Sequence, residues 1–279
     1  MKKLLLFIIV SMLLPPVSAQ IVGIRSIERL AVPPCDEGVK VSAISPQGDY
    51  VLLTTASNKG LTQWTISTQE SKLLTQAQGA GYRPVISPDG CRIAYRKQQI
   101  DDNHLRMTAI NEIDLANSGS PRQLRAPSRT AIEVSDKPVL SVKNRQLMLT
   151  HDGVTSVFSP NGMQESYIWP SLSPDGTRAL YYVCGVGAFS CRLDGTEMVS
   201  LGTLRAPQWY SDDIVVGMND VDDGHEVISS SIVAMTLDGM SQTLTSDKVI
   251  AMFPQVAPKA ARIVFTTPDD EVFLIQLDK

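Results

Sequence analysis

The chain has 279 residues and a formal net charge of −4, with 25 lysine and arginine residues against 29 aspartate and glutamate residues. Because no basic excess or basic cluster is present to neutralise phosphates, the composition argues against a nucleic-acid partner. Four cysteines are too few for a fold that depends on a disulfide scaffold. The length fits two ordinary domains or one large β architecture.

Residues 1–19 have the layout of a secretory signal peptide. Lys2 and Lys3 precede an apolar stretch from Leu4 to Leu14, and small residues follow at positions 17–19. The apolar stretch is too short to cross a bilayer about 30 Å thick, and no later segment is long enough, so we expect no transmembrane segment. We therefore expect an exported protein of bacterial type, periplasmic or secreted, with residues 20–279 as the mature chain.

A repeated segment organises the rest of the chain. Tyr82–Gly90 reads YRPVISPDG and Ile168–Gly176 reads IWPSLSPDG, while Val41–Gly48 keeps the turn without the first proline. Weaker copies occur at 132–136, 206–213 and 253–258. Steps of 38 to 48 residues separate the six copies, near the length that one four-stranded propeller blade needs. Blades are expected to begin near residues 41, 83, 131, 169, 207 and 253.

The chemistry of the repeat predicts where the chain turns. In S-P-D-G, proline presets φ, aspartate can bond the backbone ahead of it, and glycine accepts a positive φ at the exit. Such a turn joins a first strand to a second strand, which begins at Arg92, Arg178 or Arg262 in three copies. Leu-Asp-Gly turns at 193–195 and 237–239 are expected to end third strands, and fourth strands follow.

These elements predict an all-β fold, a single six-bladed β-propeller of four-stranded blades over residues 20–279. The last blade runs out of sequence after three strands. Residues 20–32, which include the β-prone segment Ile21–Ile24, are expected to supply its fourth strand. The N-terminal strand would then close the ring and leave no exposed sheet edge.

Cys184 and Cys191 flank the segment Gly185–Ala188 and are expected to lie on the two arms of one hairpin. In an oxidising compartment they are the pair that we predict to form a disulfide, with Cys35 and Cys91 free. The alternative is two buried thiols on opposite faces of the sheet, since a bridge closes only when the cross-strand geometry allows it.

The pattern P-x-x-S-P-D-G, followed by R-x-A-Y and then L-D-G, resembles the WD40-like (PD40) repeat of TolB-type β-propellers over residues 41–279. TolB proteins carry an α/β domain ahead of the propeller, whereas the mature chain offers only residues 20–40 before its first blade. For this reason the resemblance implies the fold but does not carry over the trans-envelope partners of TolB.

One face of the predicted ring collects the residue types that bind ligands. Loops between second and third strands bring histidines and carboxylates, and the segments entering first strands bring aromatic rings. The candidate binding residues are Tyr82, Asp102, His104, His151, Asp152, Trp169, Asp222, Asp223, His225 and Phe253. Polar groups among aromatic side chains are typical of ligand sites. The alternative is that these loops are polar because they face solvent, with the aromatic rings packed between blades.

The sequence offers no G-x-S-x-G, H-E-x-x-H or P-loop motif, and Val221 stands where a calcium loop would need an oxygen ligand. We therefore expect a monomeric, non-catalytic binding or scaffolding propeller of the cell envelope, which recognises a protein or glycan partner without a cofactor. No catalytic or metal-ligating residue is assigned. The alternative is a metal-dependent enzyme of the lyase or lactonase type that acts on a carbohydrate at the central mouth, where imidazole and carboxylate groups suit a divalent ion.

Overall fold

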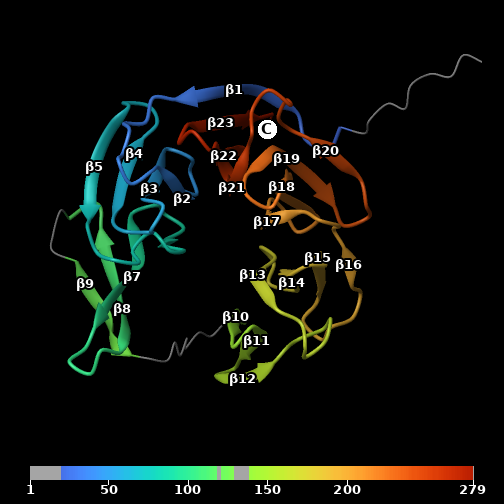
Figure 1. The fold of residues 1–279 in the computed structure, drawn as a ribbon, viewed down its shortest axis with the longest axis horizontal. Helices are drawn as coiled ribbons and strands as arrows, with labels where there is room; N and C mark the ends of the chain where they lie inside the picture. The colour runs from blue at the N-terminus through green and yellow to red at the C-terminus, as the bar shows by residue number, and fades with distance from the viewer. Residues whose placement is uncertain (1–19, 118–120, 129–137, 279) are drawn as a thin grey trace, which may run out of the picture.

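Six antiparallel sheets surround a common axis in the computed structural model, which describes residues 20–117, 121–128 and 138–278 (Figure 1). The strands of a sheet follow one another outward from the axis, so the predicted all-β, six-bladed β-propeller is confirmed. The helical structure in the described residues is one 3-10 turn, η1 (Pro258–Ala260). None of the described helical structure is long or apolar enough to cross a bilayer.

The blades are numbered here along the chain, with strands given from the axis outward. Blade 1 consists of β2 (Lys40–Ile44), β3 (Tyr50–Thr54), β4 (Leu61–Thr65) and β5 (Glu70–Thr75). Blade 2 consists of β6 (Val85–Ile86), β7 (Arg92–Ile100), β8 (Arg106–Asp114) and β9 (Arg122–Ser128). Blade 3 consists of β10 (Val139–Lys143), β11 (Gln146–His151) and β12 (Val154–Val157). Blade 4 consists of β13 (Tyr167–Leu172), β14 (Arg178–Val183), β15 (Gly187–Arg192) and β16 (Val199–Ser200). Blade 5 consists of β17 (Arg205–Trp209), β18 (Ile214–Asp222), β19 (Val227–Thr236) and β20 (Ser241–Thr243). Blade 6 consists of β21 (Met252–Ala257), β22 (Arg262–Thr266), β23 (Val272–Leu277) and β1 (Ile24–Leu30).

The N-terminal strand closes the ring, as predicted. β1 pairs antiparallel with β23, and Ile27 faces Ile275 in the register. Leu30 is the one buried residue of β1, so the pairing depends on backbone hydrogen bonds rather than on side-chain burial. Just before β1, the side chain of Gln242 on β20 accepts hydrogen bonds from the backbone N–H groups of Ile21 (2.6 Å) and Val22 (2.9 Å). The closing segment is thus attached to blade 5 as well as to blade 6.

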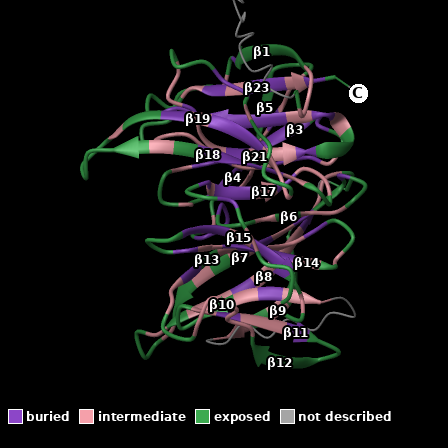
Figure 2. Cartoon of the chain, turned by 90° about the vertical axis from the view of Figure 1, so that its right-hand side faces the viewer, coloured by how far each residue is buried: buried purple, intermediate pink, exposed green. Residues whose placement is uncertain are grey.

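The hydrophobic core lies between the blades, and Figure 2 shows that the buried residues lie on the strands, whereas many of the connecting loops are exposed. Buried side chains from two neighbouring sheets meet at each of five junctions, as at the junction of blades 5 and 6, where Met218 and Ile232 pack with Phe265. Among the described residues, no such cluster joins blade 2 to blade 3. Hydrogen bonds add to the packing, because the Tyr50 hydroxyl of blade 1 donates to the Gly90 carbonyl of blade 2 at 2.8 Å.

Blade 3 departs from the predicted pattern of four strands. Its described residues form three strands, and the innermost one, β10, leads into β11 through Asn144 and Arg145, whose φ values are 52° and 69°. Two consecutive positive φ values are typical of a type I′ hairpin turn, so this blade turns without the S-P-D-G motif. The first strand predicted at 132–136 lies outside the described residues, as does the predicted signal peptide.

The predicted disulfide is wrong for this structure, in which all four cysteines are free thiols. Cys191 pairs with Ala179 in the β14–β15 ladder, whereas Cys184 lies beyond the end of β14. Five residues along a strand span about 16 Å, and a bridge needs Cα atoms within about 7 Å. The alternative of two buried thiols also fails, because Cys184 is exposed and only Cys191 is buried.

The S-P-D-G turns are held by their own side chains. In blade 4 the Ser173 hydroxyl donates to Asp175 at 2.5 Å, and the carboxylate also accepts from the backbone N–H (3.0 Å) and hydroxyl (2.8 Å) of Thr177. These hydrogen bonds, with that from Ser173 the largest contribution, lower the pKa of Asp175 to about 2. The ionised aspartate therefore stabilises the turn.

Removal of residues 20–32 should lower the melting temperature by about 5 °C or more, because β23 loses its partner and becomes an exposed edge. Differential scanning calorimetry of the shortened and the intact protein measures this effect. The matched control is Ile27→Ala, which shortens an exposed side chain on β1 and leaves its backbone pairing in place. A shortened protein that melts with the intact one would contradict the closure.

A thiol-specific reagent should modify Cys35, Cys91 and Cys184 rapidly in the folded protein and Cys191 only after unfolding. The first three thiols are exposed, and burial both shields Cys191 and raises its pKa, which lowers the thiolate fraction. Mass mapping of the labelled peptides gives the result. A Cys184–Cys191 bridge recovered from the native protein would overturn this assignment.

The substitution Asp175→Asn should destabilise the protein at neutral pH and have less effect in acid. The folded pKa lies below the unfolded value of about 3.9, so the carboxylate stabilises the fold above about pH 4 and this contribution is lost as the pH falls toward 2. Melting temperatures of the two proteins, measured between about pH 7 and pH 2, should therefore converge in acid. A constant difference over this range would contradict the proposed role.

Candidate functional site

The propeller has two different faces. The loops between second and third strands open on one side, together with the segments that lead into the first strands, and we call this side the loop face. The turns between first and second strands, such as Ser87–Gly90 and Ser173–Gly176, lie on the opposite side, the turn face. This follows from the common strand order of the six sheets.

The three histidines lie on the loop face. His104 is in the β7–β8 loop, His151 ends β11 before the β11–β12 turn, and His225 is in the β18–β19 loop. All three are exposed, and His151 pairs with the neighbouring Asp152 at 3.4 Å. In the described part of the chain, no three His, Cys, Asp or Glu side chains are gathered closely enough to hold a metal ion.

Several loop carboxylates shape their own loops. Asp101 accepts hydrogen bonds from the N–H groups of Asn103 (3.0 Å) and Leu105 (2.8 Å), which leaves Asp102 exposed at the tip. Asp223 accepts from the N–H groups of Glu226 and His225, both at 2.9 Å, and these bonds lower its pKa.

Asp222 belongs to an ionic group that the sequence reasoning missed. Arg205 on β17 contacts Asp220 at 2.5 Å and Asp222 at 3.5 Å. The Asp220 side chain is only 1% exposed, and its Oδ1 has no hydrogen-bond partner among the described residues. Asp220 follows the buried Val216 and Met218 at alternate positions of β18, so the strand period was the signal that placed its side chain toward blade 6.

The aromatic candidates do not occupy equivalent positions. Trp169 and Phe253 each precede a proline and have φ values of 51° and 52°, at points where the ladder with the second strand shifts by a bulge. Arg83 (51°) and Ala206 (47°) stand at the same place in blades 2 and 5. A bulge re-aims the side chain that it contains, so Arg83 is the counterpart of Trp169, whereas Tyr82 lies one residue earlier.

Trp169, Tyr82 and Arg83 each contact another residue of the propeller. Trp169 packs edge-on against Tyr182, with ring centroids 5.3 Å apart. The Tyr82 ring is half exposed and lies under the Arg96 guanidinium at 5.2 Å. Arg83 donates to the Pro170 carbonyl at 2.8 Å, which joins blade 2 directly to blade 4. The structure thus brings the Arg83 side chain to the backbone of Pro170, the residue after Trp169, a proximity that the sequence reasoning missed.

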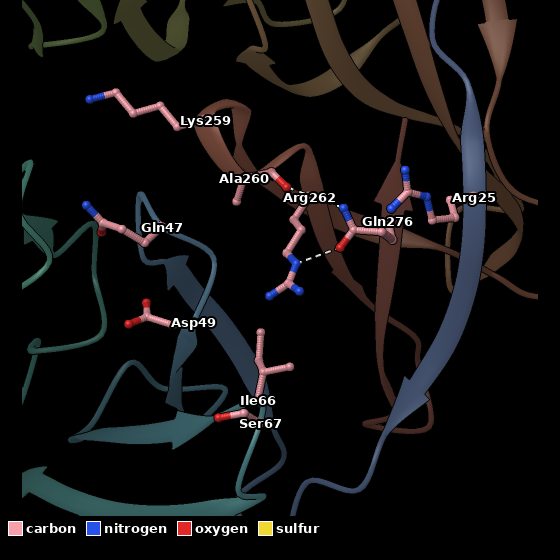
Figure 3. A pocket seen from close by; sticks show the side chains of 9 residues that line it. All are labelled: Arg25, Gln47, Asp49, Ile66, Ser67, Lys259, Ala260, Arg262 and Gln276. Atoms are coloured by element: carbon pink, nitrogen blue, oxygen red, sulfur yellow. Dashed lines mark hydrogen bonds between the residues drawn. The ribbon is translucent and has the colours of Figure 1, made fainter. Parts of the chain in front are cut away.

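The turn face contains a cavity of about 610 Å³ at the junction of blades 6 and 1 (Figure 3). Its walls come from the closing strand β1, from turns of blade 1, and from η1, β22 and β23 of blade 6. The lining residues are Arg25, Gln47, Asp49, Ile66, Ser67, Lys259, Ala260, Arg262 and Gln276. We call it the basic cavity, because three cationic side chains and one carboxylate line it. No sequence motif marks it, since its residues come from both ends of the chain.

No protein-family model matches the chain, and no curated protein matches its sequence. Solved structures do resemble it. The β-propeller domain of Cps50 (Swd1) from Myceliophteria thermophila gives a TM-score of 0.50 at 9% identity, over 91% of this chain and 100% of that one. An oligogalacturonate lyase in complex with manganese gives 0.49 at 14% identity, over 85% and 76%. Oligogalacturonate lyase from Vibrio parahaemolyticus gives 0.46 at 13% identity, over 84% and 76%. At these identities the likeness concerns the fold alone, that of a β-propeller.

Proposed function

We propose that this protein is an exported, non-catalytic binding or scaffolding propeller of the cell envelope, with repeats of the TolB type, that recognises a protein or glycan partner through its loop face. The signal-peptide layout of residues 1–19 supports export, and the S-P-D-G turns support the kinship of the repeats. A closed ring supports a binding role, because a rigid scaffold presents loops at little entropic cost on association.

The observation that carries the proposal is the pair of long hairpins on this face. In the β7–β8 hairpin both strands have nine residues, and in the β18–β19 hairpin the strands have nine and ten. The equivalent strands have five residues each in β3–β4 and six each in β14–β15. The extra length carries large apolar side chains into solvent, namely Ile100 (63% exposed), Val221 (59%) and Ile228 (59%). Exposed apolar groups rimmed by polar residues are typical of interaction sites.

The two hairpins belong to blades 2 and 5, which face each other across the six-bladed ring (Figure 1). Trp169 lies on β13 and Phe253 on β21, the inner strands of blades 4 and 6, whereas Tyr82 lies just before β6 of blade 2. Acidic groups accompany the apolar ones at both tips, Asp101 and Asp102 in blade 2 and residues 222, 223 and 226 in blade 5. A partner surface that combines apolar and basic groups would complement these tips.

The double substitution Val221→Ser and Ile228→Ser, and separately His225→Ala, should weaken partner binding about tenfold or more if these side chains are anchors. Affinity capture from envelope extract with wild-type protein identifies the partner, and titration of that purified partner gives the dissociation constants. Bound metal is measured on the same preparation, since a stoichiometric ion would favour the lyase or lactonase alternative.

The control is Asp89→Asn on the turn face, whose carboxylate accepts hydrogen bonds from Ser87 and Cys91 of its own turn. Each variant is first compared with the wild type by circular dichroism and melting temperature. If Asp89→Asn abolished partner binding while the Val221→Ser, Ile228→Ser protein bound normally, recognition would belong to the other face.

A further inference from the structure

The basic cavity has an excess of positive charge that the described residues do not neutralise. Arg25, Lys259 and Arg262 line it together with a single carboxylate, Asp49. Arg25 forms an exposed pair with Asp278 at 3.5 Å. Among the described residues, no carboxylate forms an ion pair with Lys259 or Arg262. Asp49 also lines the cavity (Figure 3), and among the described residues it forms no ion pair with any of the three cations.

Arg262 is held in place by neutral groups. Its Nε donates to the side-chain oxygen of Gln276 at 2.7 Å, and its Nη1 donates to the Gly48 carbonyl of blade 1. Gln276 is fixed in turn, because its amide donates to the Ala261 carbonyl at 3.0 Å. A partly buried guanidinium that is oriented by neutral acceptors keeps its charge available, and its planar fork matches a carboxylate or a phosphate.

The rest of the wall suits hydroxyl groups. Asp49 accepts a hydrogen bond from the Ser45 hydroxyl, which fixes the carboxylate at the edge of the cavity. Ser67 and the amide of Gln47 add donors and acceptors, and Ile66 and Ala260 provide a small apolar surface. A carboxylate beside amides can accept several hydroxyl protons, and the cavity volume falls within the range of small-molecule sites, about 300–1,000 Å³.

We propose that the basic cavity binds a small anionic polyol, a sugar-sized molecule whose carboxylate or phosphate lies against Arg262 and whose hydroxyls bond to Asp49, Ser67 and the Gln47 amide. Lys259 and Arg25 add long-range attraction from the two sides. Asp49 explains why the site favours a polyol over a bare anion, since it repels negative charge but accepts hydroxyl protons. The site lies on the turn face and is separate from the loop face of the proposed function.

The test is isothermal titration of the purified protein with four probes: D-glucuronate, D-glucose 6-phosphate, D-glucose and inorganic phosphate. One of the two charged sugars should bind, with a dissociation constant in the range of about 1 mM or below, and which one binds identifies the anion. D-glucose should bind at least about tenfold more weakly, because it lacks the charge that Arg262 recognises.

Arg262→Gln should weaken the charged sugar about tenfold or more, and Arg92→Gln is its matched control, since Arg92 begins the second strand of blade 2 as Arg262 begins that of blade 6. Because Arg262 also contacts blade 1, Lys259→Gln and Asp49→Asn serve as variants that spare this contact. Asp49→Asn should weaken the charged sugar but strengthen inorganic phosphate.

Four outcomes would overturn the proposal. The first is that neither charged sugar binds at concentrations up to about 10 mM. The second is that D-glucose binds as tightly as the charged sugars, which would remove the role of the cations. The third is that Arg262→Gln, folded as judged by its melting temperature, binds the charged sugar as the wild type does. Equal affinity for inorganic phosphate and for the charged sugar would refute the role of Asp49 and with it the polyol.

Discussion

The antiparallel pairing of β1 with β23 is the constraint on which the whole ring depends. It joins the beginning and the end of the described chain in one sheet, so that blade 6 is complete and blade 1 has a neighbour on both sides. Because β1 buries only Leu30, the pairing is made by the backbone, which any sequence without an interior proline could supply. Gln242 holds the segment just before that strand, because its side-chain oxygen accepts from the N–H groups of Ile21 and Val22 and its amide nitrogen donates to the Val22 carbonyl.

Once the ring is closed, the blades are held to one another by two kinds of contact. Apolar side chains interdigitate at five junctions, and on the turn face polar atoms reach from one blade to the glycine turn of the next. Tyr50 donates to the Gly90 carbonyl, and Arg262 donates to the Gly48 carbonyl. Both residues begin a second strand, so one repeat position serves the same purpose with different chemistry. At Arg262 the side chain is charged, and the residue that joins the two blades also lines the basic cavity.

The sequence predicted what local chemistry determines. The S-P-D-G turns and the alternation of the strands that follow gave the blade period, and the missing strand after β23 gave the closure. Blade 3 was harder, because its Asn144-Arg145 turn shares no residue with the motif. The site was predicted least well. The alignment of the repeats already placed Arg83 opposite Trp169, each before a proline, but the positive φ and the bulge at these positions are properties of backbone pairing. The strand period could place the Asp220 side chain toward blade 6, but its contact with Arg205 and the lining of the basic cavity depend on how side chains of different strands approach one another, which no local pattern encodes.

The basic cavity exists only in the closed ring, because Arg25 comes from β1, Gln276 from β23, and Gln47 and Asp49 from blade 1. A ligand in this cavity would therefore bind the closed form and not an opened one, and by mass action it would stabilise closure by RT ln(1 + [L]/Kd). At a ligand concentration of 100 times Kd this amounts to about 2.7 kcal/mol, comparable to the loss of several backbone hydrogen bonds at about 1 kcal/mol each. The β1–β23 pairing, which is made mainly by the backbone, borders this cavity, so a bound anion would add to the contacts that keep blade 6 complete and joined to blade 1. The loop face, on the other side of the disc, would gain from such a ligand only through the rigidity of the ring.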